Sequence, residues 1–128
     1  MSTATQSGPI DLDSLGPLHY LGIVLALVSG LIHVRLGLSF APSPLGLSFL
    51  FAGIVFVLAC VAVAMDYRRR LVYGLGVPFT AGQIVLWYVV NFAGGPKAFP
   101  ADVGTLGAID KIAQLLLLGV LVALLRRE

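Results

Sequence analysis

The stretch LGLSFLFAGIVFVLACVAVAM, residues 45–65, contains no charged side chain over its whole length. A run of about 20 apolar residues is long enough to cross the hydrocarbon core of a bilayer, roughly 30 Å thick, as an α-helix. Three further apolar runs of similar length lie around it, at residues 18–38, 71–92 and 106–125. The sequence therefore predicts four transmembrane helices joined by short connections.

The composition of the chain agrees with a membrane location. Of its 128 residues, 59% are hydrophobic and 11% are charged, whereas an ordinary soluble domain has roughly 25% charged residues. Because short connections make consecutive helices antiparallel neighbours, we expect an all-α, integral membrane up-down four-helix bundle over residues 15–128. Residues 1–14 are expected to form a flexible cytoplasmic tail. No positive segment precedes the first run, which predicts a retained helix instead of a cleaved signal.

Basic residues predict the orientation. Three arginines, 68–70, lie between the second and third runs, and Arg126 and Arg127 follow the fourth. With four crossings both groups lie on one side of the cell membrane, and the positive-inside rule places that side, with both termini, in the cytoplasm. The net charge of +2 fits anchoring at the inner leaflet. It gives no indication of nucleic-acid binding.

The first run carries both histidines of the chain on one face. At about 100° per residue, one wedge of roughly 80° holds His19, Gly22, Ala26, Gly30, His33 and Gly37. Small residues spaced in this way let helices approach closely in lipid. We therefore expect the small residues to pack against neighbouring helices. Arg35 points elsewhere, towards the outer headgroups.

The third and fourth runs also collect their polar side chains on one face each. In the third run this stripe contains Tyr73, Gly76, Thr80, Gln83, Trp87 and Asn91. In the fourth, Asp110 and Gln114 share a side with Gly107, and Lys111 is turned about 100° away. Compared by depth, these faces predict an outward-facing polar cluster of six residues: His33, Gln83, Trp87, Asn91, Asp110 and Gln114. Ionisable residues inside a membrane are costly, about 2.5 to 3.5 kcal/mol at mid-depth, and tend to mark function.

Structural roles for the same residues are equally open. Trp87 fits an interfacial aromatic belt, and the two glutamines fit interhelical hydrogen bonding. Asp110 fits a helix cap or an ion pair with Lys111 or Arg35.

Two function classes follow from these patterns. The first is a non-enzymatic accessory or interaction subunit of a larger membrane complex. Besides the lipid bilayer, the partners to consider are such a complex or, alternatively, further copies of this chain in a homo-oligomer. The second is a small-ligand or proton-linked pocket around His33 and Asp110. Complete transport is disfavoured because the inner half of the path has no ionisable group. The chain has no phosphate-binding loop or zinc-protease motif, and its single cysteine, Cys60, excludes an internal disulfide, so we expect no enzyme, metal site or cofactor.

A third, less favoured alternative is haem. His19 and His33 lie fourteen residues apart on one face, about 21 Å by helix rise, which resembles the axial-histidine spacing in a helix of the cytochrome b family. Iron needs ligands from a second helix. Because the chain has only these two histidines, this hypothesis requires two copies of the first helix to meet in a homodimer.

The order of short motifs along residues 17–127 resembles a family of uncharacterised small four-helix membrane proteins of halophilic archaea, a domain of unknown function. The motifs are GLIH, SPLGLSFLFAG, DYRRR, QIVLW and VGTLGAIDKIAQLLLL. The resemblance implies a four-helix topology. It also implies that His33, Trp87 and Asp110 occupy recurrent polar positions, without assigning a role to any of them.

Overall fold

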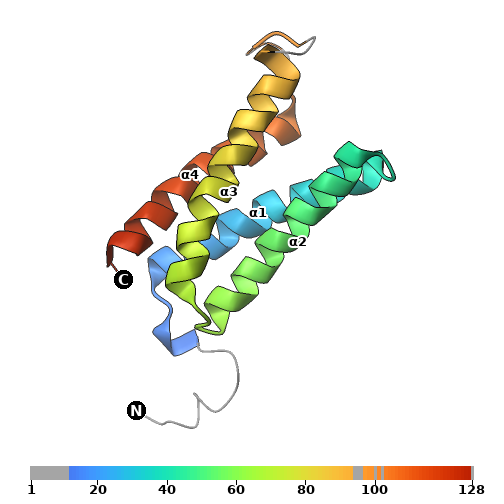
Figure 1. Ribbon diagram of the computed structural model, residues 1–128. Helices are drawn as coiled ribbons and strands as arrows, with labels where there is room; N and C mark the ends of the chain where they lie inside the picture. The colour runs from blue at the N-terminus through green and yellow to red at the C-terminus, as the bar shows by residue number, and fades with distance from the viewer. Residues whose placement is uncertain (1–11, 94–96, 100, 102, 128) are drawn as a thin grey trace.

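The computed structural model describes residues 12–93, 97–99, 101 and 103–127 (Figure 1). Its four long helices are α1 (Pro17–Phe40), α2 (Pro44–Ala64), α3 (Arg69–Tyr88) and α4 (Thr105–Arg127). A 3-10 turn, η2 (Leu12–Ser14), precedes α1, and a π-helical turn, η3 (Val89–Ala93), continues α3. The all-α prediction is confirmed over these residues, and all four helices are long and apolar enough to cross a membrane. Most of the predicted flexible tail lies outside the described residues, and its last three residues form η2.

The boundary between α1 and α2 is set by local capping. Pro44 occupies the first turn of α2, where its missing N–H is not needed. Ser43 caps this helix, because its Oγ accepts a hydrogen bond from the Gly46 N–H at 3.1 Å and donates one to the Phe40 carbonyl. Ser43 therefore satisfies groups at the end of α1 and at the start of α2.

The arginines close the opposite end of the molecule, which we call the arginine end. The turn between α2 and α3 places Asp66 and Arg68 in the left-handed region, with φ of 53° and 49°. The Arg69 Nε donates to the Val63 carbonyl of α2 at 2.8 Å. The Arg70 Nη1 donates to the Leu125 carbonyl of α4 at 3.0 Å. Both contacts cap C-terminal carbonyls, where positive charge is favourable.

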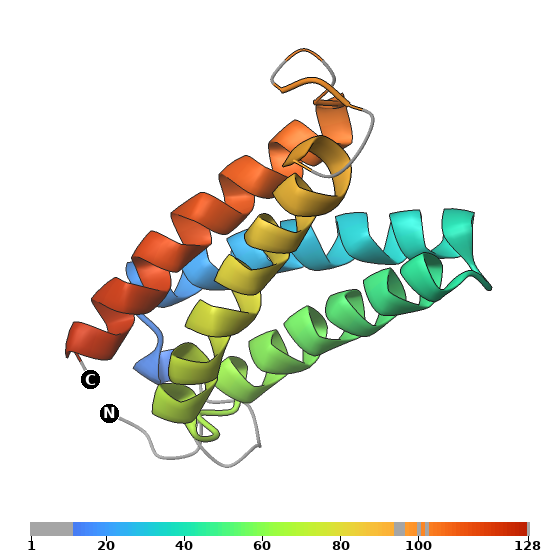
Figure 2. The ribbon, with the colours of Figure 1, turned by 45° about the horizontal axis from the view of Figure 1, so that its top comes forward.

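The helices form two antiparallel hairpins, α1–α2 and α3–α4, that pack together near the arginine end and diverge towards the other (Figures 1 and 2). Helix α1 packs on α4 from Gly22, beside Val120, to His33, beside Asp110. The core lies in this shared part and draws on all four helices. Towards the turn that joins them, α1 and α2 lean away from α3 and α4 (Figure 2). The bundle is therefore closed at one end and open at the other, which the sequence does not predict.

A seam of glycines holds α2 against α1. A Cβ at Gly53 would lie 2.8 Å from the Gly30 carbonyl oxygen, and one at Gly37 would lie 2.9 Å from that of Gly46. Two of the predicted packing residues, Gly30 and Gly37, thus face α2. Gly22 faces α4, with its Cβ position 3.2 Å from Val120, and Ala26 is buried in the core. This close contact requires glycine on both helices. It keeps α2 packed against α1 in the part of the molecule where the two hairpins diverge.

Candidate functional site

Polar side chains from three helices come together around α4, which packs against both α1 and α3. We call this group the polar cluster; it consists of Ser29, His33, Gln83, Asp110, Lys111 and Gln114. Ser29 and Gln114 have no exposed surface, and Asp110 is 4% exposed. Of the other members, His33 and Lys111 are buried and Gln83 is half-buried. That the cluster faces the outer side of the membrane stays a prediction.

Asp110 is the acceptor at the centre of the polar cluster. Its Oδ1 accepts a hydrogen bond from the Ser29 Oγ at 2.5 Å, and its Oδ2 accepts one from the Lys111 Nζ at 2.7 Å. The His33 Nδ1 lies 3.7 Å from the same Oδ1. A buried carboxylate is tolerated only when it is paired and hydrogen-bonded, and here both oxygens have partners.

Lys111 enters the polar cluster although its position on the helix points away from Asp110. Its flexible side chain carries the Nζ back to Asp110 and to the Gln114 Oε1, at 2.8 Å. The same Nζ lies 5.5 Å from the centre of the Trp87 ring, within the range of a cation–π contact. Asp110 and Lys111 thus form the ion pair that the sequence offers as a structural role, and the pair is buried.

The two glutamines connect the helices. The Gln114 Nε2 donates to the Ser29 Oγ and to the Gln83 Oε1, each at 3.1 Å. The Gln83 Nε2 donates to the Phe79 carbonyl of its own helix at 3.2 Å. A continuous chain of hydrogen bonds therefore runs from α1 through α4 to α3.

His33, a member of the polar cluster, has a defined tautomer. Its Nδ1 lies 2.8 Å from the Ser29 carbonyl oxygen, which can only accept. The neutral ring therefore carries its proton on Nδ1, which leaves Nε2 as the acceptor. The ring packs against Phe49 and Phe56 of α2, with centroids 5.7 and 6.0 Å away.

Not every predicted site residue joins the polar cluster. Asn91 is half-buried and donates from Nδ2 to the Trp87 carbonyl at 2.9 Å, a contact within its own helical segment. Trp87 contacts the cluster through Lys111, whose Nζ lies over its ring. Sequence reasoning did not identify Ser29 or Lys111 as members. The signals were present, because Ser29 lies one turn before His33 and Lys111 follows an aspartate inside an apolar run.

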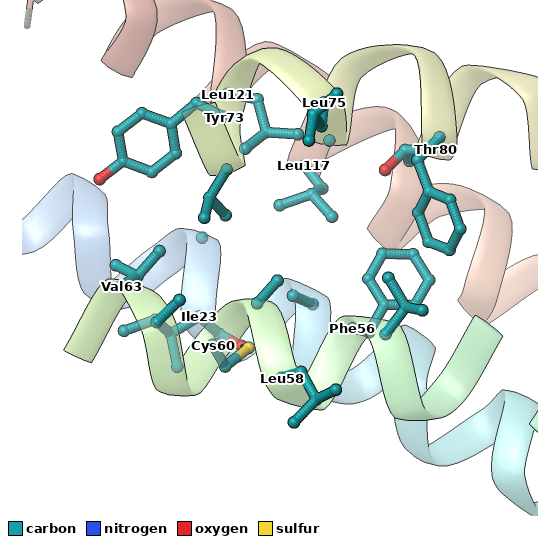
Figure 3. Close-up of a pocket in the computed structure, with 18 of the residues that line it drawn as sticks. Ile23, Phe56, Leu58, Cys60, Val63, Tyr73, Leu75, Thr80, Leu117 and Leu121 are labelled. Carbon is teal, nitrogen blue, oxygen red and sulfur yellow. The ribbon is translucent and has the colours of Figure 1, made fainter. Parts of the chain in front are cut away.

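A cavity of about 630 Å³ lies elsewhere, between α2 and α3, and none of the six cluster residues lines it (Figure 3). Its walls are mainly apolar side chains of α2 and α3, such as Leu58 and Leu75, and α1 and α4 contribute Ile23 and Leu117. Arg68 lines it at the arginine end. The sequence gives no indication of this space, because its apolar lining looks like any lipid-facing surface.

Metal and haem binding find little support in this geometry. Among the described residues, no group of three or more His, Cys, Asp or Glu side chains could hold a metal ion. His19 is 8% exposed and accepts at Nδ1 from the Gly16 N–H at 2.9 Å, and His33 is 5% exposed. A haem shared between two copies of α1 would need both rings to leave these positions.

Comparisons with known proteins add no family to this description. The chain matches no protein-family model, no curated protein and no solved structure. The resemblance to the haloarchaeal family stays a prediction. Functional inference therefore depends on the geometry of the chain.

Proposed function

We propose that this protein is a multi-pass membrane protein that acts without catalysis, as an accessory or interaction subunit. Four helices of sufficient length and apolarity support membrane insertion. The arginines at one end support an orientation with both termini in the cytoplasm.

The observation that carries the proposal is that the polar groups of the cluster form their hydrogen bonds and ion pair with one another. Asp110 uses both oxygens, Gln114 uses both ends of its amide, and Lys111 bridges the two. Such a closed network supports a structural joint between two hairpins more than a site that must offer free groups to a substrate. Beyond this joint the hairpins separate (Figure 2), and apolar side chains such as Leu38, Leu47 and Val90 are exposed there. These exposed side chains are available to another membrane component.

The interaction role predicts a stoichiometric partner in the native membrane. Extraction in native nanodiscs followed by mass spectrometry should give a complex heavier than the 13.5 kDa chain, with a second polypeptide at fixed stoichiometry. Asp110→Asn, which disturbs the joint, should lower the occupancy of that polypeptide. Lys97→Gln changes an exposed charge and should leave it unchanged. A single chain, or a whole-number multiple of it, as the only species would contradict the accessory role.

A second candidate is a proton-linked switch at the joint, favoured by the 3.7 Å separation of the His33 Nδ1 and the Asp110 Oδ1. The charged groups facing His33 are Asp110 and Lys111 of α4, which already neutralise one another. The facing side chains of α2 are phenylalanines. A proton on His33 would therefore add an unbalanced charge at the junction of the hairpins.

The switch predicts that the hairpin separation depends on pH. Spin labels on Leu47 of α2 and Val90 of η3, both exposed, would report it in a Cys60→Ala background. We expect their distance distribution in bilayers to differ between about pH 5.5 and about pH 8. His33→Gln should abolish the difference. Identical distributions in the parent protein at both pH values would exclude the switch.

A further inference from the structure

We propose that the cavity between α2 and α3 binds one chain of an anionic lipid, with the lipid phosphate at Arg68. This site is separate from the polar cluster and goes beyond the proposed interaction role. Three features support it: the length of the cavity, its apolar lining and the cation at its mouth.

The length of the cavity matches one leaflet. Its lining on α2 runs from Phe51 to Val63, which corresponds to about 18 Å by helix rise. Half of a hydrocarbon core roughly 30 Å thick is about 15 Å. A transmembrane helix of a partner would need a groove along the full thickness, whereas a lipid chain needs one of this length.

The lining suits a hydrocarbon chain. The lining side chains come from both helices, with Val63 of α2 on one side of the space and Leu75 of α3 on the other (Figure 3). Ile23 of α1 and Leu117 of α4 complete the surface. An apolar occupant would stabilise such a cavity, because the side chains that line an empty space lack dispersion contacts on that side.

The mouth at the arginine end carries the charge that selects the occupant. Arg69 and Arg70 are committed to the Val63 and Leu125 carbonyls. Arg68 is exposed, lines the cavity, and lies with its guanidinium carbon 5.6 Å from the centre of the Tyr67 ring, another lining side chain. Basic pockets between transmembrane helices on the cytoplasmic side bind anionic headgroups. Arginine is also well suited to a phosphate because its planar fork can donate two parallel hydrogen bonds.

The test is native mass spectrometry of the purified full chain, titrated with phosphatidylglycerol or with phosphatidylcholine of the same acyl chains. The parent protein should retain one phosphatidylglycerol in preference to phosphatidylcholine. Arg68→Gln should lower this preference about fivefold, the effect expected for one basic residue near the headgroups. Glutamine keeps the Cβ, so the backbone cost at this left-handed position is unchanged. Arg127→Gln, an exposed arginine that does not line the cavity, is the matched control and should keep the preference.

Two further variants test the cavity itself. Ala59→Phe fills the cavity from α2. Leu58→Trp enlarges another lining side chain, and because Leu58 is 61% exposed, the larger ring is less disruptive to the fold. Both should reduce the retention of either lipid. Val61→Phe adds the same ring to an exposed position of α2 outside the lining and should not. Equal retention of the two lipids by the parent, undiminished binding in the filled variants, or a lipid-free dimer would each overturn the proposal.

Discussion

Asp110→Asn is expected to lower the free energy of unfolding by about 3 to 5 kcal/mol, because it leaves the buried ammonium group of Lys111 without its counter-ion. Lys111 is 8% exposed, so water cannot replace the lost carboxylate. Unfolding in mixed micelles, followed by circular dichroism across a titration with denaturing detergent, measures the loss. Asp66→Asn is the matched control. That carboxylate is 52% exposed, lies 3.3 Å from the Arg69 Nε, and should contribute no more than about 1 kcal/mol.

The double variant Asp110→Asn with Lys111→Met separates the ion pair from the rest of the network. Removing both charges together should restore most of the stability, to within about 2 kcal/mol of the parent, because no uncompensated charge is left in the interior. If the two substitutions instead destabilise additively, Asp110 and Lys111 do not stabilise one another as an ion pair.

The helices could be predicted from the sequence because apolar length alone specifies them. The run from residue 45 to residue 65 needs no partner to be recognised as a helix, and α2 occupies residues 44–64. The divergence of the hairpins could not be predicted in the same way. It depends on which helix Gly46 and Gly53 face, and their positions in the sequence do not reveal that.

Part of the polar cluster could also be predicted from the sequence, because helical periodicity indicates which side chains share a face. Helical periodicity places His33, Asp110 and Gln114 on faces that point into the bundle, and the structure brings these three together with Gln83. Helical periodicity does not predict that Lys111 is a member, since the direction of a Cα–Cβ bond says little about where the end of a long side chain lies. Helical periodicity also wrongly includes Asn91, because the amide of Asn91 donates to a carbonyl one turn away on its own segment.

Gly53→Ala is expected to destabilise the protein by about 1 to 3 kcal/mol, the usual effect of overfilling a close contact. The added Cβ would lie 2.6 Å from the Val34 Cγ2 and 2.8 Å from the Gly30 carbonyl oxygen. Val34 has few rotamers in a helix, and the carbonyl belongs to a backbone that cannot move alone. The helices must separate to accommodate the methyl group. The detergent titration used for Asp110 measures the loss.

Gly119→Ala is the matched control, because a Cβ there meets nothing within 4 Å. In the interior of α4, alanine should be neutral or stabilising by up to about 1 kcal/mol, since glycine loses more conformational freedom in a helix. The two substitutions add the same methyl group in the same type of helix and are expected to act with opposite sign. If both substitutions change the free energy of unfolding with the same sign and size, the change reflects helix propensity. In that case close packing of α2 on α1 is not what holds the first hairpin together.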